Sequence, residues 1–213
     1  MNTRTTAILS TGLMTAAALA LVSVPAASAT PAGDVTTHAD LDGDGTDELV
    51  TVRAAGTDAQ KLLVEVAGEE LRAEVPADAE GIVRPPRIVD LNNDGREELA
   101  VRERFSSDTH VFGVWEYADG RLRSLSTPNG HQFRLYDGAD DTSTYGYGCV
   151  EEDDVRSVVV MNASEDDAGT WSGSQVYYSV ADGVVTPTGG DITFTALPFV
   201  GPALHPDRDT CAA

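Results

Sequence analysis

The chain has 213 residues, and 35 Asp and Glu residues outnumber 14 Lys and Arg residues, which gives a formal net charge of −21. Such a surface repels nucleic acid and anionic lipid, so we expect neither nucleic acid nor a membrane as a partner. The length allows one domain with a sizeable core, and we expect a monomer.

The N-terminus has the features of a secretory signal peptide. Arg4 precedes a mostly apolar run at 7–24, and Ala27-Ser28-Ala29 is a small-residue cleavage site. We therefore expect a signal peptide at 1–29, a single mature domain at 30–213, and a secreted, extracellular protein. A membrane anchor is the alternative, but the run is rich in Ala and interrupted by polar residues.

Beyond the signal, β-prone runs alternate with Gly and Pro turns, and helical periodicity is weak. The pattern predicts an all-β fold of three repeated antiparallel β-meander units, at about 36–80, 86–138 and 144–190, in a partial β-propeller-like or compact β arrangement. A C-terminal strand and disulfide tail would occupy 191–213. The strands are expected at 48–54, 60–67, 70–75, 97–104, 109–117, 121–126, 154–162, 172–181, 184–188 and 192–197.

Each unit contains a similar turn. The segments Glu65–Leu71, Glu116–Leu122 and Ser179–Val185 all run from a β-prone stretch through a Gly-containing turn into another stretch. Such turns favour β-hairpins, most strongly where Asp precedes Gly. Residues 57–71 also allow a short helix, but the turn at Gly68 favours strands.

Two acidic loops, at 40–50 and 90–100, share one pattern: oxygen-bearing side chains at positions 1, 3 and 5, Gly at position 6 and Glu at position 9. Calcium prefers six to eight oxygen ligands, so the pattern predicts two Ca²⁺ sites. The first loop is expected to bind more tightly, because it has four candidate carboxylates against three. The candidate ligands are Asp40, Asp42, Asp44, the Thr46 carbonyl and Glu48, and then Asp90, Asn92, Asp94, the Arg96 carbonyl and Glu98.

The loops do not fit an EF-hand. That motif requires a bidentate Glu at position 12, where this chain has Thr51 and Val101, and the following residues are β-prone instead of helical.

The motif Asp-x-Asp/Asn-x-Asp-Gly-x-x-Glu-Leu before a strand resembles the calcium loop of FG-GAP repeats, found in integrin-like β-propeller blades and in bacterial VCBS-type repeat proteins. The resemblance implies structural Ca²⁺, and the chain is similar to small secreted actinobacterial proteins with such repeats. It covers 40–50 and 90–100 closely; the third unit has no such loop. Phe112-Gly113 is the one Phe-Gly pair.

Cys149 and Cys211 are the two cysteines, and in an exported chain an isolated pair is expected to form a disulfide. The bond would close a loop of roughly 60 residues and add about 4 kcal/mol of stability in the chain-entropy model.

We find no motif for catalysis: no G-x-S-x-G turn, no H-E-x-x-H helix, and four His residues without metal-ligand spacing. Asp137, Asp140 and Asp141 form either a third ligand loop or a solvated loop. The sequence thus favours a secreted calcium-binding module for an extracellular protein or carbohydrate, or a structural domain. The alternatives are a secreted hydrolase with an unrecognised active site and an inhibitor or effector protein.

Overall fold

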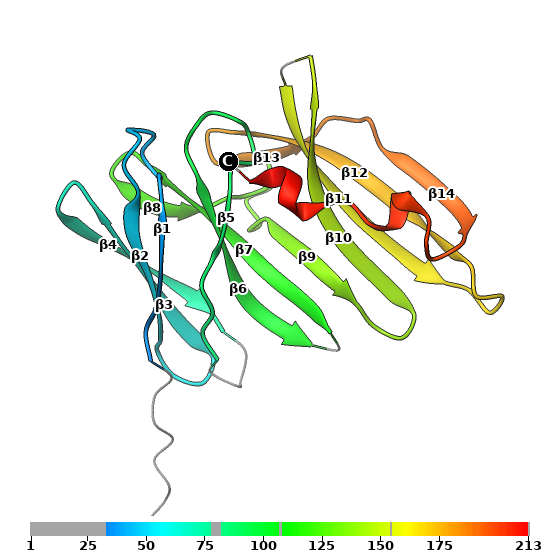
Figure 1. Ribbon diagram of the computed structural model, residues 1–213, viewed down its shortest axis with the longest axis horizontal. Helices are drawn as coiled ribbons and strands as arrows, with labels where there is room; N and C mark the ends of the chain where they lie inside the picture. The colour runs from blue at the N-terminus through cyan, green and yellow to red at the C-terminus, as the bar shows by residue number, and fades with distance from the viewer. Residues whose placement is uncertain (1–32, 78–81, 107, 154, 213) are drawn as a thin grey trace, which may run out of the picture. The chain divides into compact units, whose positions relative to one another are not determined.

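Runs of β-branched residues divided by short turns fold most of this chain into strands. The structure, a computed structural model, describes residues 33–77, 82–106, 108–153 and 155–212 (Figure 1). The expected signal peptide lies outside these residues. Within them, no helix has the length and apolar character needed to cross a membrane.

The first four strands form a sheet of their own, in the order β1-β2-β3-β4, with every pair antiparallel. In β2, Val50 and Val52 are buried while Leu49 between them is exposed, as expected for a strand with one covered face. The predicted strands in this region are confirmed to within one residue. The strands are β1 Val35–Ala39, β2 Glu48–Ala54, β3 Ala59–Val66 and β4 Glu69–Pro76.

A ten-stranded antiparallel sheet follows, in the order β13-β12-β11-β10-β9-β7-β6-β5, with β8 beside β7 and β14 beside β12 (Figure 1). Its strands are β5 Arg87–Val89, β6 Glu98–Ser106, β7 Thr109–Ala118, β8 Arg121–Ser124, β9 Arg134–Ala139, β10 Ser143–Glu152, β11 Val155–Glu165, β12 Trp171–Ala181, β13 Val184–Pro187 and β14 Ile192–Leu197.

The three similar turns fold alike. Ala67-Gly68, Asp119-Gly120 and Asp182-Gly183 are two-residue turns in which both residues have positive φ, close to 50° and then 74–82°. Such turns match the twist of antiparallel strands and favour Gly at the second position. They connect β3 to β4, β7 to β8 and β12 to β13. The three expected β-hairpins are therefore present in an all-β, antiparallel structure.

The units differ in how they begin and how they join. The first and second each have an acidic loop between their first two strands, β1 and β2 or β5 and β6. At the corresponding place in the third unit, β10 ends at Glu152 and β11 starts at Val155, which leaves no room for a loop of this length. β9 joins the second and third units into one sheet, and the strand ladders of the described residues do not close into a propeller.

β6 and β7 are covered on both faces. Leu99 and Val101 pack with the four-stranded sheet, whereas Ala100, Phe112 and Val114 face a second core shared with β9–β13. The strand expected at 109–117 is therefore present as β7 and lies inside the sheet, between β6 and β9. The buried amide of Gln60 on β3 ties the two sheets together, donating to the carbonyl oxygens of Pro76 (2.9 Å) and Arg102 (2.6 Å).

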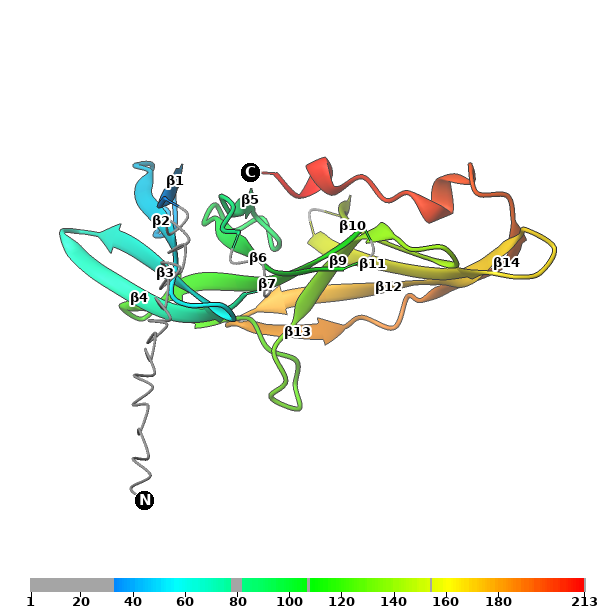
Figure 2. The ribbon, with the colours of Figure 1, turned by 90° about the horizontal axis from the view of Figure 1, so that it is seen from below.

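The C-terminal tail runs back across β10 and β11 through two short 3₁₀ helices, η1 Pro202–Leu204 and η2 Arg208–Cys211 (Figures 1 and 2). Cys211 of η2 forms the predicted disulfide with Cys149 of β10. Thr210 Oγ1 also accepts a hydrogen bond from the Cys149 backbone N–H, at 2.7 Å. The tail is thereby fixed to the large sheet.

Candidate metal centre

The first acidic loop is organised by Asp40, which directly follows β1. Its two carboxylate oxygens accept backbone hydrogen bonds from Gly43 and Gly45, each at 2.9 Å. Both glycines have positive φ, near 80°, a conformation that glycine adopts at little cost. The Asp40 side chain therefore holds the two glycine turns of the loop together.

The later acids of this loop also accept hydrogen bonds from backbone N–H groups of the loop itself. Asp42 accepts from the Asp44 N–H, and Asp44 accepts from the Thr46 N–H at 2.7 Å. Glu48, the first residue of β2, reaches back to accept from the Leu41 N–H at 2.8 Å. Asp40, Asp42 and Glu48 each bring one oxygen into a group whose members lie within 4.8 Å of one another.

The second loop repeats these bonds. Asp90 accepts from the Asn93 and Gly95 N–H groups (2.6 and 3.3 Å), and Asp94 accepts from the Arg96 N–H (2.9 Å). Glu98 accepts from the Leu91 N–H at 2.8 Å, the counterpart of the Glu48 bond. The sequence repeat is therefore a structural repeat as well.

The two loops differ at position 3. Asn92 donates its Nδ2 to Asp94 at 2.9 Å, so its amide partly satisfies the neighbouring carboxylate. Asp90, Asp94 and Glu98 do not form a three-acid group as tight as that of the first loop within the described residues. Asp44 of the first loop also lies outside its group of three acids.

Burial of the position-9 carboxylates is the main electrostatic feature. Glu98 is 2% exposed; burial, and then repulsion from Asp90 and Asp94, raises its pKa to about 8. Glu48 is 8% exposed, and burial together with the charges of Asp42, Asp40 and Asp44 raises its pKa. A buried carboxylate among other acids favours a bound cation or proton, because its own charge is poorly solvated.

The loops contact each other. The Asp40 N–H donates to Glu97 Oε2 at 2.7 Å, and the Glu97 N–H donates to the Asp40 carbonyl oxygen at 2.8 Å. The Arg96 side chain lies over Gly43, where a Cβ would come within 3.0 Å of it. The role of Glu97 does not follow from its spacing in the sequence, because its place in the interface depends on how the two units pack.

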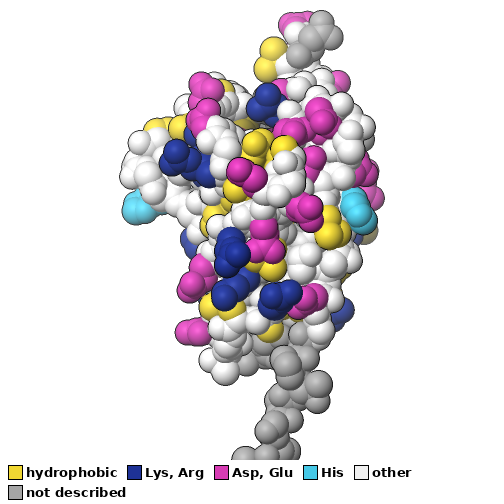
Figure 3. All heavy atoms as spheres, turned by 90° about the vertical axis from the view of Figure 1, so that its left-hand side faces the viewer, with side chains coloured by type: hydrophobic (Ala, Val, Ile, Leu, Met, Phe, Trp, Pro, Cys, Tyr) yellow, Lys and Arg dark blue, Asp and Glu magenta, His cyan; other side chains and the backbone are white. Residues whose placement is uncertain are grey.

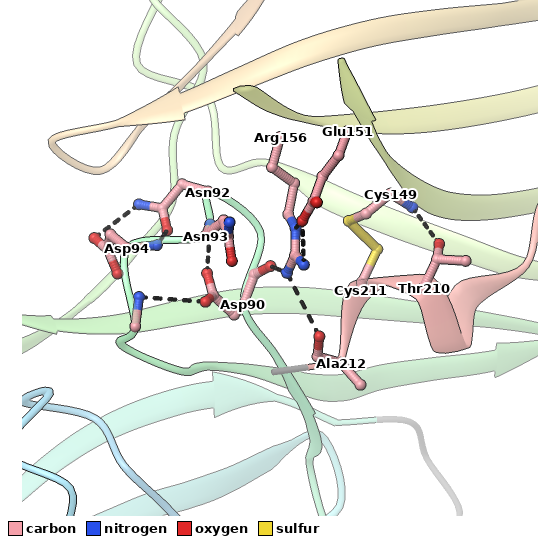
Figure 4. A network of polar contacts seen from close by, with 11 residues as sticks. Asp90, Asn92, Asn93, Asp94, Cys149, Glu151, Arg156, Thr210, Cys211 and Ala212 are labelled. Carbon is pink, nitrogen blue, oxygen red and sulfur yellow. Dashed lines mark hydrogen bonds and ion pairs between the residues drawn. A yellow bond between two sulfur atoms is a disulfide. The ribbon is translucent and has the colours of Figure 1, made fainter. Parts of the chain in front are cut away.

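The second loop is also held by the C-terminal tail (Figure 4). The Asp90 N–H donates to the Cys211 carbonyl oxygen at 2.8 Å, and Arg156 Nη1 donates to the Asp90 carbonyl oxygen at 2.6 Å. Arg156 is fixed in turn by an ion pair with Glu151 at 2.7 Å. The first residue of the loop therefore has both backbone groups anchored.

The ligand atoms of both loops fit a hard cation. They are carboxylate, amide and carbonyl oxygens, with no nitrogen or sulfur donor of the kind that zinc or copper prefers. None of the ion pairs found between described residues uses a predicted ligand carboxylate. The residues thus suit Ca²⁺ in donor type and in their need for positive charge.

The alternative third ligand loop is not assembled in the described residues. Asp137 lies between two guanidinium groups, 2.7 Å from Arg87 Nη2 and 2.6 Å from Arg208 Nη1. Asp140 accepts from the Thr142 and Ser143 N–H groups and shapes the β9–β10 turn. These acids have structural partners instead of an open ligand set.

Comparison with known proteins gives no further assignment: no protein-family model matches the chain, and neither a curated protein nor a solved structure is significantly similar to it.

Proposed function

We propose that this chain is a secreted calcium-binding β-repeat protein in which two Ca²⁺ ions stabilise the corners of FG-GAP/VCBS-like units. One observation carries the proposal: two loops 50 residues apart make the same set of backbone bonds and end in the same buried Glu, Glu48 and Glu98. A solvated acidic turn has no need to bury that carboxylate, whereas a cation site gains a ligand from it.

The role of the ions is structural. A ligand that binds only the folded state stabilises it by RT ln(1 + [L]/Kd), about 2.7 kcal/mol at a hundredfold excess over Kd. Because the loops contact each other through Asp40 and Glu97, the stabilisation acts where the two sheets meet. The protein then serves as a binding or structural module for an extracellular protein or carbohydrate.

The surface charges and the disulfide are both compatible with an extracellular module. On the face shown in Figure 3, acidic and basic side chains lie interspersed, without a continuous basic area for a polyanion. The Cys149–Cys211 bond is consistent with an extracellular protein. No observation favours the hydrolase or the inhibitor alternative over the module.

Thermal unfolding in calcium and in chelator tests the proposal. We expect calcium to raise the unfolding midpoint of the purified protein, and the double variant Glu48→Gln/Glu98→Gln to lose most of that rise. Asp47→Asn, an exposed acid in the first loop, is the matched control and should keep it. An identical midpoint of the parent protein in calcium and in chelator would contradict the proposal.

A further inference from the structure

A cleft of about 460 Å³ lies over β9–β12 and shares no residue with the acidic loops. Its lining includes Phe133, Arg134, Tyr136, Tyr145, Asn162 and Tyr178. β9, β10, β11 and β12 are consecutive neighbours in the large sheet (Figure 1), so the side chains belong to one continuous surface.

The walls are aromatic. Three of the six tyrosines of the chain line this cleft. They form two ring pairs: Tyr136 with Tyr145 at 5.9 Å between centroids, and Tyr178 with Phe133 at 5.5 Å. Within the described residues, the hydroxyls of Tyr136, Tyr145 and Tyr178 make no hydrogen bond to another protein group, so they are free to bond a ligand.

One end of the cleft has a fixed polar group. The buried carboxylate of Glu103 accepts from Gln132 Nε2 at 2.8 Å and from Arg134 Nε at 2.6 Å. Arg134 Nη2 also donates to Gln132 Oε1 at 2.9 Å, which fixes the guanidinium and the amide relative to each other. Gly113 leaves room for this arrangement, because a Cβ there would lie 2.6 Å from Gln132 Nε2.

The cleft is close to neutral, unlike the protein as a whole. None of the described residues that line it is Asp or Glu, although the chain has 35 of them. Its one charged lining residue, Arg134, is neutralised by Glu103 behind it. The side chain of Asn162, on β11 directly opposite Tyr145 in the ladder, adds an amide that is free of other described protein groups.

We propose that this cleft binds a neutral saccharide. Sugar rings present apolar C–H faces that stack on aromatic side chains, and hydroxyls that bond amides, phenols and guanidinium groups. Free phenol hydroxyls, a free amide, a neutralised Arg and the lack of acids all match such a ligand. The inference deepens the binding role proposed above, by naming a ligand class for the module.

The experiment is isothermal titration calorimetry of the purified protein in calcium with neutral hexasaccharides of glucose, mannose, xylose and N-acetylglucosamine. Polygalacturonate and a Tyr-rich peptide are the competing ligands. We expect saturable binding of at least one neutral hexasaccharide. Tyr136→Ala and Tyr145→Ala should each weaken it about tenfold or more, as expected for central aromatic contacts. Asn162→Ala, a change at an exposed polar position, should weaken binding without lowering the unfolding midpoint.

Phe105→Ala is the matched control, because Phe105 is 37% exposed, close to the 38% of Tyr136, and lies outside the cleft. It should leave the affinity unchanged. Absence of binding to all four neutral hexasaccharides overturns the inference, as does preference for the acidic polymer or the peptide, or an equal loss in the control. These outcomes are separate from the calcium-dependent midpoint, which tests the metal loops alone.

Discussion

Asp40 and Glu97 exchange hydrogen bonds across the junction of the two acidic loops: each backbone N–H donates to an oxygen of the other residue, at 2.7 and 2.8 Å. One of these oxygens belongs to the Glu97 side-chain carboxylate. Burial raises the pKa of this carboxylate and the hydrogen bond from the Asp40 N–H lowers it, with a net rise. The Glu97 carboxylate therefore connects the second unit to the first at the backbone of Asp40, a candidate calcium ligand.

Glu97→Ala should destabilise the protein. It removes the acceptor of the Asp40 N–H in a half-buried place, a loss of about 1–3 kcal/mol. The free energy of unfolding from urea denaturation measures it. Asp47→Ala, at an exposed acid near Glu97, is the control and should stay within about 0.5 kcal/mol of the parent. Equal stability of Glu97→Ala and the parent would show that the bond contributes nothing.

Exchanging the residues at position 3 should exchange the affinities of the loops. Asp42 is one of three clustered acids in the first loop, whereas Asn92 bonds Asp94 in the second. Because calcium affinity follows ligand charge, Asp42→Asn should weaken the tighter site about tenfold and Asn92→Asp should strengthen the weaker one similarly. Calorimetric calcium titrations of the single and double variants measure both sites. If Asp42→Asn affected only the weaker site, the predicted order of affinities would be wrong.

Runs of β-prone residues between turns predicted six of the eight strands in the first two units, although only some of these strands alternate between buried and exposed positions. The same pattern missed the short strands β1, β5 and β9, and it missed β10, where Gly146 and Gly148 suggest turns. The structure explains those glycines by packing: a Cβ on Gly146 would lie 3.0 Å from Pro206, and one on Gly148 would lie 2.7 Å from the Asp207 carbonyl oxygen. They leave room for a tail 60 residues away in sequence, which no local pattern reveals.

The candidate site shows the same limit. The candidate ligands come from local spacing alone, and the hydrogen bonds that bend each loop join residues at most seven positions apart. Glu97 contacts the first loop from the second unit, and Arg156 and the tail contact the second loop from later in the chain. These contacts depend on tertiary packing. The cleft over β9–β12 was missed for the same reason, because its tyrosines come from three different strands.

Removing the disulfide should lower the calcium affinity of the second loop more than that of the first. Cys211 accepts a hydrogen bond from the Asp90 N–H, so the bond to Cys149 anchors the start of that loop. Cys149→Ser/Cys211→Ser should cost about 4 kcal/mol of stability in the chain-entropy model and lower calcium affinity at the second loop. Denaturant unfolding and calcium titration measure the two effects. A single-site variant, Asn92→Asp, identifies which titration step belongs to the second loop.

His110 should make the fold sensitive to mild acid. Its ring lies 4.7 Å from that of Phe105, and its buried Nδ1 has no hydrogen-bond partner within the described residues. Burial, and then the charges of Arg102, Arg87 and Arg208, lowers the pKa of His110 below its ordinary 6.5, although Asp137 acts in the opposite direction. The unfolded chain therefore binds this proton more readily, so the stability His110 contributes is full above about pH 6.5 and is lost as the pH falls through the lower folded-state value.

Thermal unfolding at about pH 7.5 and about pH 5.5 measures this effect. The midpoint of the parent should fall further on acidification than that of His110→Phe, which cannot take up the proton but still fills the place beside Phe105. His131, an exposed histidine, supplies the control, and His131→Phe should keep the parent's acid sensitivity. Because the many carboxylates titrate alike in all three proteins, the difference between variants isolates the imidazole. Equal acid sensitivity of the parent and His110→Phe would mean that the His110 proton is bound equally well in the folded and unfolded states.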